Sequence, residues 1–475
     1  MMGKESESEA EIEMRFDAGT LVLDADAETA SILGKHVHFD ERIGRYRASA
    51  SDYALLIRML HACGIAVRDQ VRAYRELPDL LLYTRNRPMK HQQEAYEAWK
   101  QAKCRGLVVL PTGAGKTFFA FLAMAGVKRS TLVVVPTIDL LQQWATQLEK
   151  AFRREVGMLG GGSRRIEDIT VSTYDSAVLQ MEFIGNRFGL VVFDECHHLP
   201  GPVNRFAASM CAAPYRLGLT ATPECGEEGD EVLRRLIGET VYRAHIDELE
   251  GSILSPYITR RLEVKLSEEE ARQYREAREK YTGFLRTHGI HFSEAGAWGR
   301  FLALCGRRPE GREVLNSYFR QRSIARCSHA KIEVLWDIIR NNPDARILVF
   351  TADNDTAYAI GEQLCLPVLT HKTRAAERKD FLESFRNGDY PVLVTSKVLN
   401  EGVDVPEANI GIVVSGSASI REHVQRLGRI LRAKEGKQAR LYELVSEGTS
   451  EMSVSDRRRR NRAYRNSAAG PIRST

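Results

Sequence analysis

The sequence predicts an α/β protein with two parallel sheets in tandem, a small α+β domain before them and a helical insertion between them. Two stretches alternate short apolar runs, typical of strands, with amphipathic helical patterns, which is the order of elements in parallel sheets. The apolar runs are rich in Val and Leu, as strands covered by helices on both faces are. A chain of 475 residues also leaves room for about three or four domains of ordinary size.

The beginning of the chain divides into two parts. Residues 1–13 contain a glutamate at every second position from Glu5 to Glu13, and we expect an acidic, disordered tail. Residues 14–85 mix short strand patterns with a helix near Asp52 to His61. They are expected to form the small α+β domain.

The two sheets are predicted from two series of apolar runs. The first series lies within residues 86–255, with strands at 107–110, 132–135, 169–172, 190–193 and 216–219. The second lies within residues 329–450, with strands at 346–350, 366–369, 392–395, 410–414 and 441–444. Each series is expected to form one parallel sheet with helices on both faces.

Two further segments lack the strand pattern. Residues 256–328 are predicted to form a helical insertion, because no strand pattern is found from about Ser267 to Arg326, and Ser267 before three glutamates supplies a helix N-cap and an acidic first turn. Residues 451–475 are rich in arginine and are expected to form a basic, solvated tail. An arm that holds nucleic-acid phosphates is the alternative for this tail.

Composition limits the class of protein. The 43% of hydrophobic residues is typical of a globular chain, and the net charge of +5 permits a nucleic-acid partner without requiring one. Eight cysteines form no C-x-x-C pair and follow no signal-peptide segment, which favours a reduced, cytoplasmic chain, and no apolar run approaches the ~20 residues of a membrane span. Cys196, His197, His198 and Cys211 match no common zinc spacing, so no zinc site is expected there.

A glycine-rich turn between the first strand and the first helix of the first sheet predicts a nucleotide-binding P-loop. The turn follows strand 107–110, and an apolar helix follows the turn. Glycine lets the backbone approach phosphate closely, a lysine reaches the β- and γ-phosphates, and a threonine ligates Mg²⁺. Leu110 occupies the position of the usual first glycine. The predicted ATP-binding residues are Pro111, Thr112, Gly113, Ala114, Gly115, Lys116 and Thr117.

Two carboxylates follow a later strand of the same sheet. Strand 190–193 ends directly before Asp194 and Glu195, and the carboxyl ends of parallel strands are where such folds hold their ligands. Asp194 is predicted to fix Mg²⁺ together with Thr117, and Glu195 to orient and polarise the attacking water. Lys116, Asp194 and Glu195 are thus the catalytic candidates of the first sheet.

A basic segment of the second sheet supplies further catalytic candidates. Gln425, Arg429 and Arg432 are spaced so that on a helix all three point the same way. Two guanidinium groups facing out of one lobe suit a γ-phosphate held by the other, as arginine fingers do. A basic amphipathic surface helix is the alternative for this segment alone.

Taken together and in order, these segments resemble the motifs of helicase superfamily 2. The resemblance implies two tandem RecA-like P-loop lobes with parallel sheets, a small N-terminal α+β domain and a helical thumb-like insertion. The matching segments are 111–117 (motif I), 135–141 (Ia), 172–175 (Ib), 194–197 (II), 219–223 (III), 349–351 (IV), 400–406 (V) and 425–432 (VI). Ordered motifs over this much of the chain make a chance match very improbable.

Within that superfamily the chain is most similar to the XPB-like branch in its shorter archaeal and bacterial form. Segments 39–47, 171–177 and 400–404 are the basis of this narrower resemblance. It implies a damage-recognition-like domain at 14–85, ATP and Mg²⁺ as cofactors, double-stranded or forked DNA as substrate, 3′ to 5′ polarity and a role in DNA repair. It also implies a partner nuclease of the Bax type.

The resemblance assigns roles to further residues. Gln92 is the candidate adenine contact, and Gly402 and Asp404 are expected to line the nucleotide cleft from the second lobe. Thr220 and Thr222 of motif III are expected to couple hydrolysis to lobe movement. Thr137, Thr173 and Thr395 are expected to touch the phosphate backbone of DNA.

One departure from the family pattern affects the expected activity. The family places an Arg-Glu-Asp triplet directly after motif III, but here Cys225 stands at the Arg position and Glu227 and Glu228 follow, which should repel phosphate. The sequence therefore supports ATP hydrolysis and translocation more strongly than strand separation. Two alternatives stay open: a recruitment subunit that binds DNA and positions a nuclease without processive unwinding, and a motor of the same superfamily on RNA or in a restriction-type complex.

Overall fold

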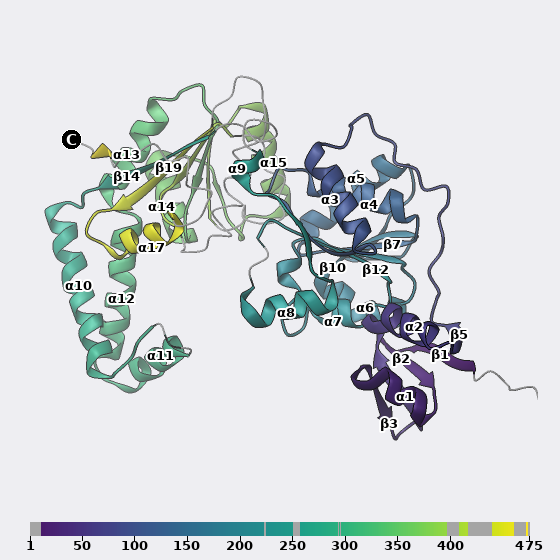
Figure 1. Cartoon of the computed structure of the whole chain (residues 1–475). Coiled ribbons are helices and arrows are strands. Elements are labelled where there is room, and N and C mark those ends of the chain that lie inside the picture. The colour runs from purple at the N-terminus through teal and green to yellow at the C-terminus, as the bar shows by residue number, and fades with distance from the viewer. Residues whose placement is uncertain are drawn as a thin grey trace, which may run out of the picture. The chain divides into compact units, whose positions relative to one another are not determined.

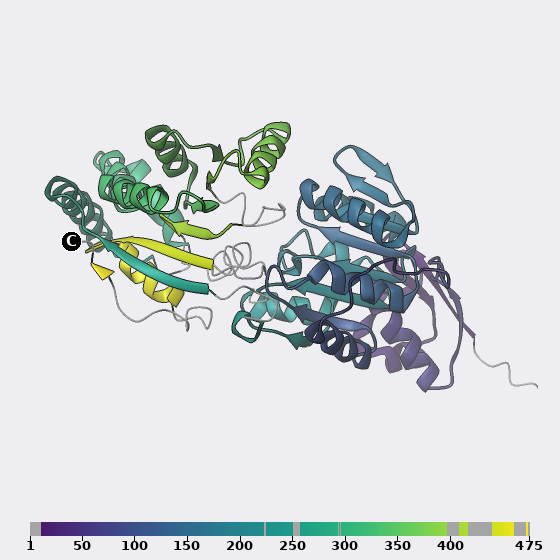
Figure 2. The same cartoon turned by 90° about the horizontal axis from the view of Figure 1, so that it is seen from above.

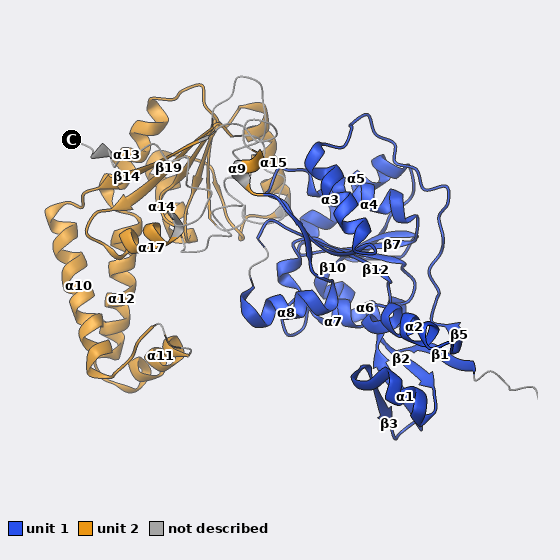
Figure 3. Cartoon of the chain, in the orientation of Figure 1, with its two compact units in different colours: residues 1–244 blue, residues 245–475 orange. Residues whose placement is uncertain are grey.

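The computed structural model of the chain describes residues 11–222, 225–249, 257–292, 294, 296–396, 408–416, 439–459 and 472–473. The chain divides into two compact units, residues 1–244 and 245–475 (Figure 3). Each unit is described by itself.

The first unit begins with a small α+β domain. Its described sheet has the order β3-β4-β2-β1-β5, and all neighbours are antiparallel except β1 and β5. Ile12 and Met14 of β1 are buried, because alternate side chains of this strand point into the core. Strand β1 therefore includes residues 11–13, which the sequence analysis placed in the acidic tail. The elements are β1 (Glu11–Asp17), β2 (Thr20–Asp24), α1 (Ala27–Leu33), η1 (Gly34–His36), β3 (Val37–Asp40), β4 (Arg45–Ser49), η2 (Ala50–Asp52), α2 (Tyr53–Ala62) and β5 (Ala66–Gln70).

This domain packs against the rest of the first unit. Ala212 belongs to its hydrophobic core, Ser49 Oγ donates to the Ser209 carbonyl oxygen at 3.0 Å, and Asn186 Nδ2 donates to the Val71 carbonyl oxygen at 2.9 Å. Gly19 has a φ of +79° and faces Met210 so closely that a Cβ would lie 2.4 Å from its methyl carbon. The domain and the sheet that follows therefore share a continuous interface.

An eight-stranded sheet forms the rest of the first unit. Its order is β13-β6-β12-β11-β7-β10-β8-β9, and only β9 is antiparallel to its neighbour. Helices α3, α4 and α5 cover one face, and α6, α7 and α8 cover the other (Figure 1). The strands are β6 (Arg105–Val109), β7 (Thr131–Val135), β8 (Gly157–Gly160), β9 (Ser163–Arg165), β10 (Ile169–Thr173), β11 (Leu190–Phe193), β12 (Tyr215–Thr220) and β13 (Thr240–Arg243). The helices are α3 (Lys90–Gln101), α4 (Lys116–Val127), α5 (Ile138–Phe152), α6 (Tyr174–Ile184), η3 (Cys196–His198), α7 (Phe206–Ser209) and α8 (Gly226–Leu236).

The second unit contains a parallel sheet with the order β16-β17-β15-β18-β19-β14-β20 among its described residues (Figure 2). Strand β14 (Tyr257–Val264) pairs along its whole length with β19, so these residues belong to the sheet although the sequence analysis included them in the helical insertion. Their run is rich in arginine and lacks the continuous apolar pattern of the neighbouring strands. The other strands are β15 (Ile347–Phe350), β16 (Val368–Leu369), β17 (Val392–Thr395), β18 (Ile410–Val413), β19 (Ala439–Ser446) and β20 (Ile472–Arg473). The helices beside this sheet are α9 (Ile246–Leu249), α13 (His329–Arg340), α14 (Asn354–Leu364), α15 (Ala375–Asn387) and α17 (Ser450–Arg459).

The ten strands predicted from apolar runs are all confirmed, and no predicted end differs from the observed one by more than two residues. The helical insertion is α10 (Glu268–Thr287), α11 (Ala297–Arg307) and α12 (Gly311–Arg326), with α10 beside α12 (Figure 1). Ser267 accepts from the Glu270 backbone N–H, as its N-cap position predicts. Phe284 and Phe301 form the centre of a small aromatic core there. Over the described residues, no helix is long and apolar enough to cross a membrane.

A segment of the expected basic tail is a packed helix. Helix α17 is fixed to the second sheet because Lys331, whose side chain is fully buried, donates from Nζ to Glu451 Oε2 at 2.5 Å and to the Val414 carbonyl oxygen at 2.8 Å. Ser455 is also buried. A buried ammonium group needs such partners, since desolvation disfavours its charge.

Candidate nucleotide-binding and catalytic site

The turn between β6 and α4 has the backbone conformation of a phosphate-binding loop. Gly113 and Gly115 have φ values of +89° and +80°, which side chains rarely adopt. A Cβ on Gly115 would also lie 2.4 Å from Gln92 Nε2. The loop therefore requires glycine at position 115, and α4 begins directly after it at Lys116, so that the helix N-terminus faces the loop.

The Lys116 ammonium group lies beside Glu195 without a hydrogen-bond partner. Its Nζ is 3.5 Å from Glu195 Oε1, and the two side chains are 11% and 12% exposed. Among the described residues, neither Lys116 Nζ nor Glu195 Oε2 forms a hydrogen bond. A buried ammonium group that forms no hydrogen bond is costly even beside a carboxylate, and phosphate oxygens would supply the missing acceptors. The residues present therefore fit a nucleotide phosphate.

Asp194 lies at the same edge of the sheet, because β6, β11 and β12 are parallel neighbours in the order β6-β12-β11. Its Oδ1 accepts from the Glu195 backbone N–H at 3.0 Å, and its Oδ2 accepts from Trp144 Nε1 at 2.9 Å. Burial, together with the neighbouring Glu195 charge, raises the pKa of Asp194 to about 6, although Lys116 and Trp144 oppose this shift. A buried carboxylate of this kind fits a magnesium ion, whose charge would favour the ionised form.

His197 lies between Glu195 and motif III. Its Nδ1 lies 3.4 Å from Glu195 Oε2 and 3.1 Å from Thr220 Oγ1, and the Thr220 hydroxyl donates to the Thr222 carbonyl oxygen at 3.1 Å. The sequence places His197 in motif II but does not show that its ring bridges Glu195 and Thr220. Among the described residues, no cluster of His, Cys, Asp and Glu has metal-binding geometry, and Cys196 and Cys211 lie in the apolar core.

Gln92 contacts the backbone of the P-loop. Its Oε1 accepts from the Met89 backbone N–H at 3.0 Å, and its Nε2 lies 3.4 Å from the Ala114 carbonyl oxygen and 3.3 Å from that of Gly115. His91 Nε2 also lies 2.8 Å from the Ala114 carbonyl oxygen. Helix α3 is thus attached to the loop, and the adenine contact expected of Gln92 stays a prediction.

Two of the predicted DNA-contact threonines cap neighbouring helices. Thr137 Oγ1 accepts from the Leu140 backbone N–H at the start of α5, and Thr173 Oγ1 accepts from that of Ser176 at the start of α6. Strands β7 and β10, which precede these helices, are adjacent and parallel, with Val135 paired to Thr173. The two helix N-termini therefore lie at the same edge of the sheet as the P-loop.

Comparison with known proteins decides the family. The damage recognition domain of xeroderma pigmentosum group B helicase matches residues 14–71, the res subunit of type III restriction enzymes matches 85–225, and the ERCC3/RAD25/XPB C-terminal helicase matches 320–464. The DNA 3′-5′ translocase XPB2 of Sulfurisphaera tokodaii is 39% identical over 94% of this chain and 99% of its own length. The chain belongs to the XPB helicase family. The DNA 3′-5′ helicase XPB of Mycobacterium tuberculosis is 33% identical over 75% of this chain and 60% of its own length.

Solved structures agree with this XPB-type fold. The helicase domain of Pyrococcus furiosus Hef matches 78% of this chain and 97% of its own length with a TM-score of 0.54 and 20% identity. Saccharomyces cerevisiae Dbp5, bound to RNA and ADP BeF3, matches 82% of this chain and 90% of its own length with a TM-score of 0.56 and 14% identity. At these identities the likeness concerns the fold, and it confirms the predicted pair of RecA-like lobes.

The other predicted site residues of this XPB-family chain belong to the second lobe. Thr395 is fully buried at the end of β17, and its hydroxyl donates to the Ser396 carbonyl oxygen at 3.1 Å, so it offers no donor to DNA in this conformation. The remaining candidates of the second lobe fall in segments 397–407 and 417–438, outside the described residues, and their roles stay predictions. They are Gly402, Asp404, Gln425, Arg429 and Arg432.

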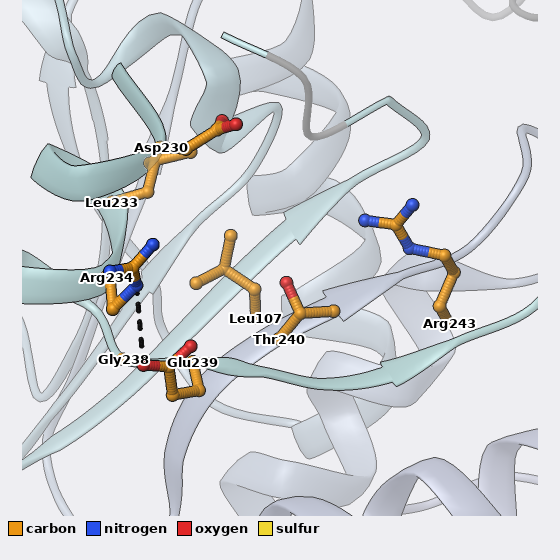
Figure 4. Close-up of a pocket in the computed structure, with 8 residues that line it drawn as sticks. All are labelled: Leu107, Asp230, Leu233, Arg234, Gly238, Glu239, Thr240 and Arg243. Atoms are coloured by element: carbon orange, nitrogen blue, oxygen red, sulfur yellow. Dashed lines mark ion pairs between the residues drawn. The ribbon is translucent and has the colours of Figure 1, made fainter. Parts of the chain in front are cut away.

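A polar hollow of about 210 Å³ lies between α8 and β13, away from the motifs (Figure 4). Arg234 and Glu239 on its wall form an ion pair at 3.4 Å, and Leu107 lies at its base. Because the opposite charges on this wall pair with each other, the hollow indicates no particular ligand.

Proposed function

We propose that this chain uses ATP hydrolysis to translocate along duplex DNA in the 3′ to 5′ direction during DNA repair. As a member of the XPB family it is an ATP-driven DNA helicase of the 3′ to 5′ type. The single observation that best supports the proposal is the Lys116 ammonium group, which is buried at the glycine-rich turn, lies 3.5 Å from Glu195 and forms no hydrogen bond with the described residues.

Each residue of this edge has a chemical task in the proposal. The backbone N–H groups of residues 111–117 and the Lys116 ammonium group bind the phosphates, and Thr117 and Asp194 hold Mg²⁺. Bound Mg²⁺ neutralises charge on the β- and γ-phosphates. Glu195 orients the attacking water and accepts its proton, and the His197 ring lies 3.4 Å from its second carboxylate oxygen.

The second lobe completes the site in this proposal. Arg429 and Arg432 stabilise the charge that develops on the γ-phosphate in the transition state, and Gln425 lies on the same helical face. Gly402 and Asp404 line the cleft around the nucleotide. Hydrolysis then depends on both lobes, which is how it is coupled to their relative movement.

DNA contacts are proposed at the N-termini of α5 and α6. The first turn of a helix has backbone N–H groups without intrahelical partners, and such groups bind phosphate without reading bases. A motor that contacts the backbone in this way can move along any sequence.

We propose that translocation along DNA, and not strand separation, is the main activity of this motor. Cys225, at the position of the family's wedge-forming arginine, donates from its backbone N–H to Asp230 Oδ1 at 3.0 Å, and its Sγ lies 3.6 Å from the His197 carbonyl oxygen. It begins α8, whose first turn contains Glu227 and Glu228. A residue held inward beside two acidic side chains is poorly suited to separate the strands of a duplex. A partner nuclease of the Bax type would then act on the DNA that this motor exposes or remodels.

The test compares three outputs of the same preparation. Steady-state ATP hydrolysis is measured without nucleic acid, with single-stranded DNA, with duplex DNA and with RNA, beside triplex displacement and unwinding of a forked duplex. Stimulation by duplex DNA with triplex displacement and little unwinding supports the proposal, and Lys116→Ala is the inactive control. Strong fork unwinding would refute the preference for translocation, stronger stimulation by RNA would refute the DNA track, and absent hydrolysis would favour a recruitment subunit.

A further inference from the structure

Asp194 receives a hydrogen bond from each of two helices outside motif II. Trp144 of α5 donates from Nε1 to the carboxylate oxygen Oδ2 at 2.9 Å. Tyr174 of α6 donates from its hydroxyl to the backbone carbonyl oxygen of Asp194 at 3.1 Å. The side chain and the backbone of the candidate magnesium ligand are thus both held by residues for which the sequence analysis predicted no contact with Asp194, although Tyr174 lies within motif Ib.

Both donors are fixed in place by their surroundings. Trp144 is 1% exposed and lies edge-on to Phe121 of α4, with ring centroids 6.0 Å apart. Tyr174 is 3% exposed and stacks on Phe193, with ring centroids 6.3 Å apart. Because neither ring has room to turn, each follows any movement of its own helix.

The same two helices begin at the proposed DNA contacts. Thr137 caps α5, and Trp144 lies two helical turns further along; Thr173 caps α6, and Tyr174 is its first residue. Any displacement of either helix by a phosphate bound at its N-terminus would thus reach a hydrogen bond to Asp194. The strength of that bond depends steeply on distance and angle, so a displacement of a few tenths of an ångström matters.

Trp99 provides a comparison within the same unit. It is also fully buried, and its Nε1 donates to the backbone carbonyl oxygen of Arg216 at 3.1 Å, remote from the P-loop. Packing and an ordinary carbonyl acceptor thus suffice to satisfy a buried indole. Trp144 instead donates to a carboxylate that burial destabilises, and this partner choice indicates a task beyond packing.

We infer that Trp144 and Tyr174 are positioning residues that couple DNA contact at the starts of α5 and α6 to the orientation of Asp194. The inference rests on the proposed function, because it assumes that duplex DNA stimulates hydrolysis. Trp144 orients the Asp194 carboxylate, and Tyr174 fixes the position of the Asp194 backbone at the edge of the sheet.

The first test uses Tyr174→Phe, which removes only the hydroxyl donor, and Trp144→Phe, which keeps an aromatic ring but removes the indole donor together with some buried volume. Trp99→Phe is the matched control, because it removes an equally buried indole donor elsewhere. We expect Trp144→Phe to lower the ratio of duplex-stimulated to DNA-free turnover about 10-fold. We also expect it to raise about 10-fold the Mg²⁺ concentration that half-saturates the binding of fluorescent ADP, which is a measurement without turnover. Tyr174→Phe should lower the same ratio, and Trp99→Phe should leave both quantities near those of the wild type.

The second test follows the indole directly and needs no substitution at the site. The chain is labelled with 5-fluorotryptophan, and the ¹⁹F signal of Trp144 is assigned by its loss in Trp144→Phe or by elimination with variants of the other three tryptophans. This signal should shift when duplex DNA is added without nucleotide. The Trp99 signal should stay in place. An unmoved Trp144 signal, or a stimulation ratio that Trp144→Phe leaves intact, overturns the inference. A wild type that duplex DNA does not stimulate refutes the proposed function instead.

Discussion

Replacing Asp194 by asparagine should stabilise the protein while removing its hydrolytic activity. Burial and the neighbouring Glu195 charge raise the pKa of Asp194 to about 6, which means that the folded protein disfavours the charge that this residue has at neutral pH. Asparagine has a similar shape and no charge. The substitution therefore removes an electrostatic cost and, with it, the proposed magnesium ligand.

The magnitude follows from two opposing contributions. The difference between a pKa of about 6 and the ordinary value of 3.8 corresponds to about 3 kcal/mol of lost stability when the carboxylate is ionised. Two donors, Trp144 Nε1 and the Glu195 N–H, face the carboxylate, and the single amide oxygen of asparagine can serve only one of them. The unserved donor costs about 1–2 kcal/mol, which leaves a net gain of about 1–2 kcal/mol near neutral pH.

The pH dependence gives the sharper test. Since the folded-state pKa lies above the unfolded one, the wild type gains stability as the pH falls through about 6 toward 4, whereas Asp194→Asn does not. The electrostatic cost is reduced to about half by pH 5, so the advantage of the variant should shrink to about zero there.

Thermal denaturation of the ligand-free chain at about pH 7.5 and about pH 5 measures this difference. A gain of about 1–2 kcal/mol should raise the melting temperature of the first unit by about 2–6 °C at the higher pH. Asp24→Asn, at an exposed ion pair with Arg45, is the matched control and should change the melting temperature little at either pH. A variant that is no more stable than the wild type at pH 7.5, or whose advantage persists at pH 5, would contradict the reasoning.

Three further predictions concern other residues. Glu195→Gln should bind ATP but hydrolyse it at least about 100-fold more slowly, as nucleotide binding and turnover measured side by side will show; near-normal turnover would assign the base elsewhere. Arg432→Ala should lower kcat more than nucleotide affinity, because its contact strengthens in the transition state, and an unchanged kcat would remove it from that role. Lys331→Met should destabilise the second unit by about 3 kcal/mol in urea denaturation, since Glu451 loses its buried partner, and adding Glu451→Gln should restore some of the loss; additive losses would mean that the pair is not coupled.

The sequence predicted the strands of both sheets because their apolar runs are buried on both faces. Strands such as β11 at Leu190–Phe193 and β15 at Ile347–Phe350 are completely buried. Strand β14 was not predicted, since Arg260, Arg261 and Glu263 interrupt its apolar pattern. Arg261 is instead neutralised by ion pairs to Glu263 and Asp456, and these pairings involve residues that the sequence pattern does not bring together.

The site was predictable where one local segment specifies the geometry. The glycine-rich turn is such a segment, and the structure gives Gly113 and Gly115 the positive φ values that such a turn requires. The contacts of Asp194 with Trp144 and Tyr174 were not predictable, because they join three separate elements through side chains that look like ordinary core aromatics. Only the hydrogen-bond distances from Trp144 and Tyr174 to Asp194 distinguish these two residues from packing residues such as Phe121.

Several features at this edge of the first sheet are unfavourable in the free protein. Asp194 is buried with a raised pKa, the Lys116 ammonium group lacks a hydrogen bond, and Glu195 has a φ of +44° that non-glycine residues rarely adopt. A nucleotide with its magnesium ion would relieve the first two by supplying a cation to Asp194 and phosphate oxygens to Lys116. The site is therefore preorganised at a cost to stability, which the binding of a nucleotide with its magnesium ion would offset.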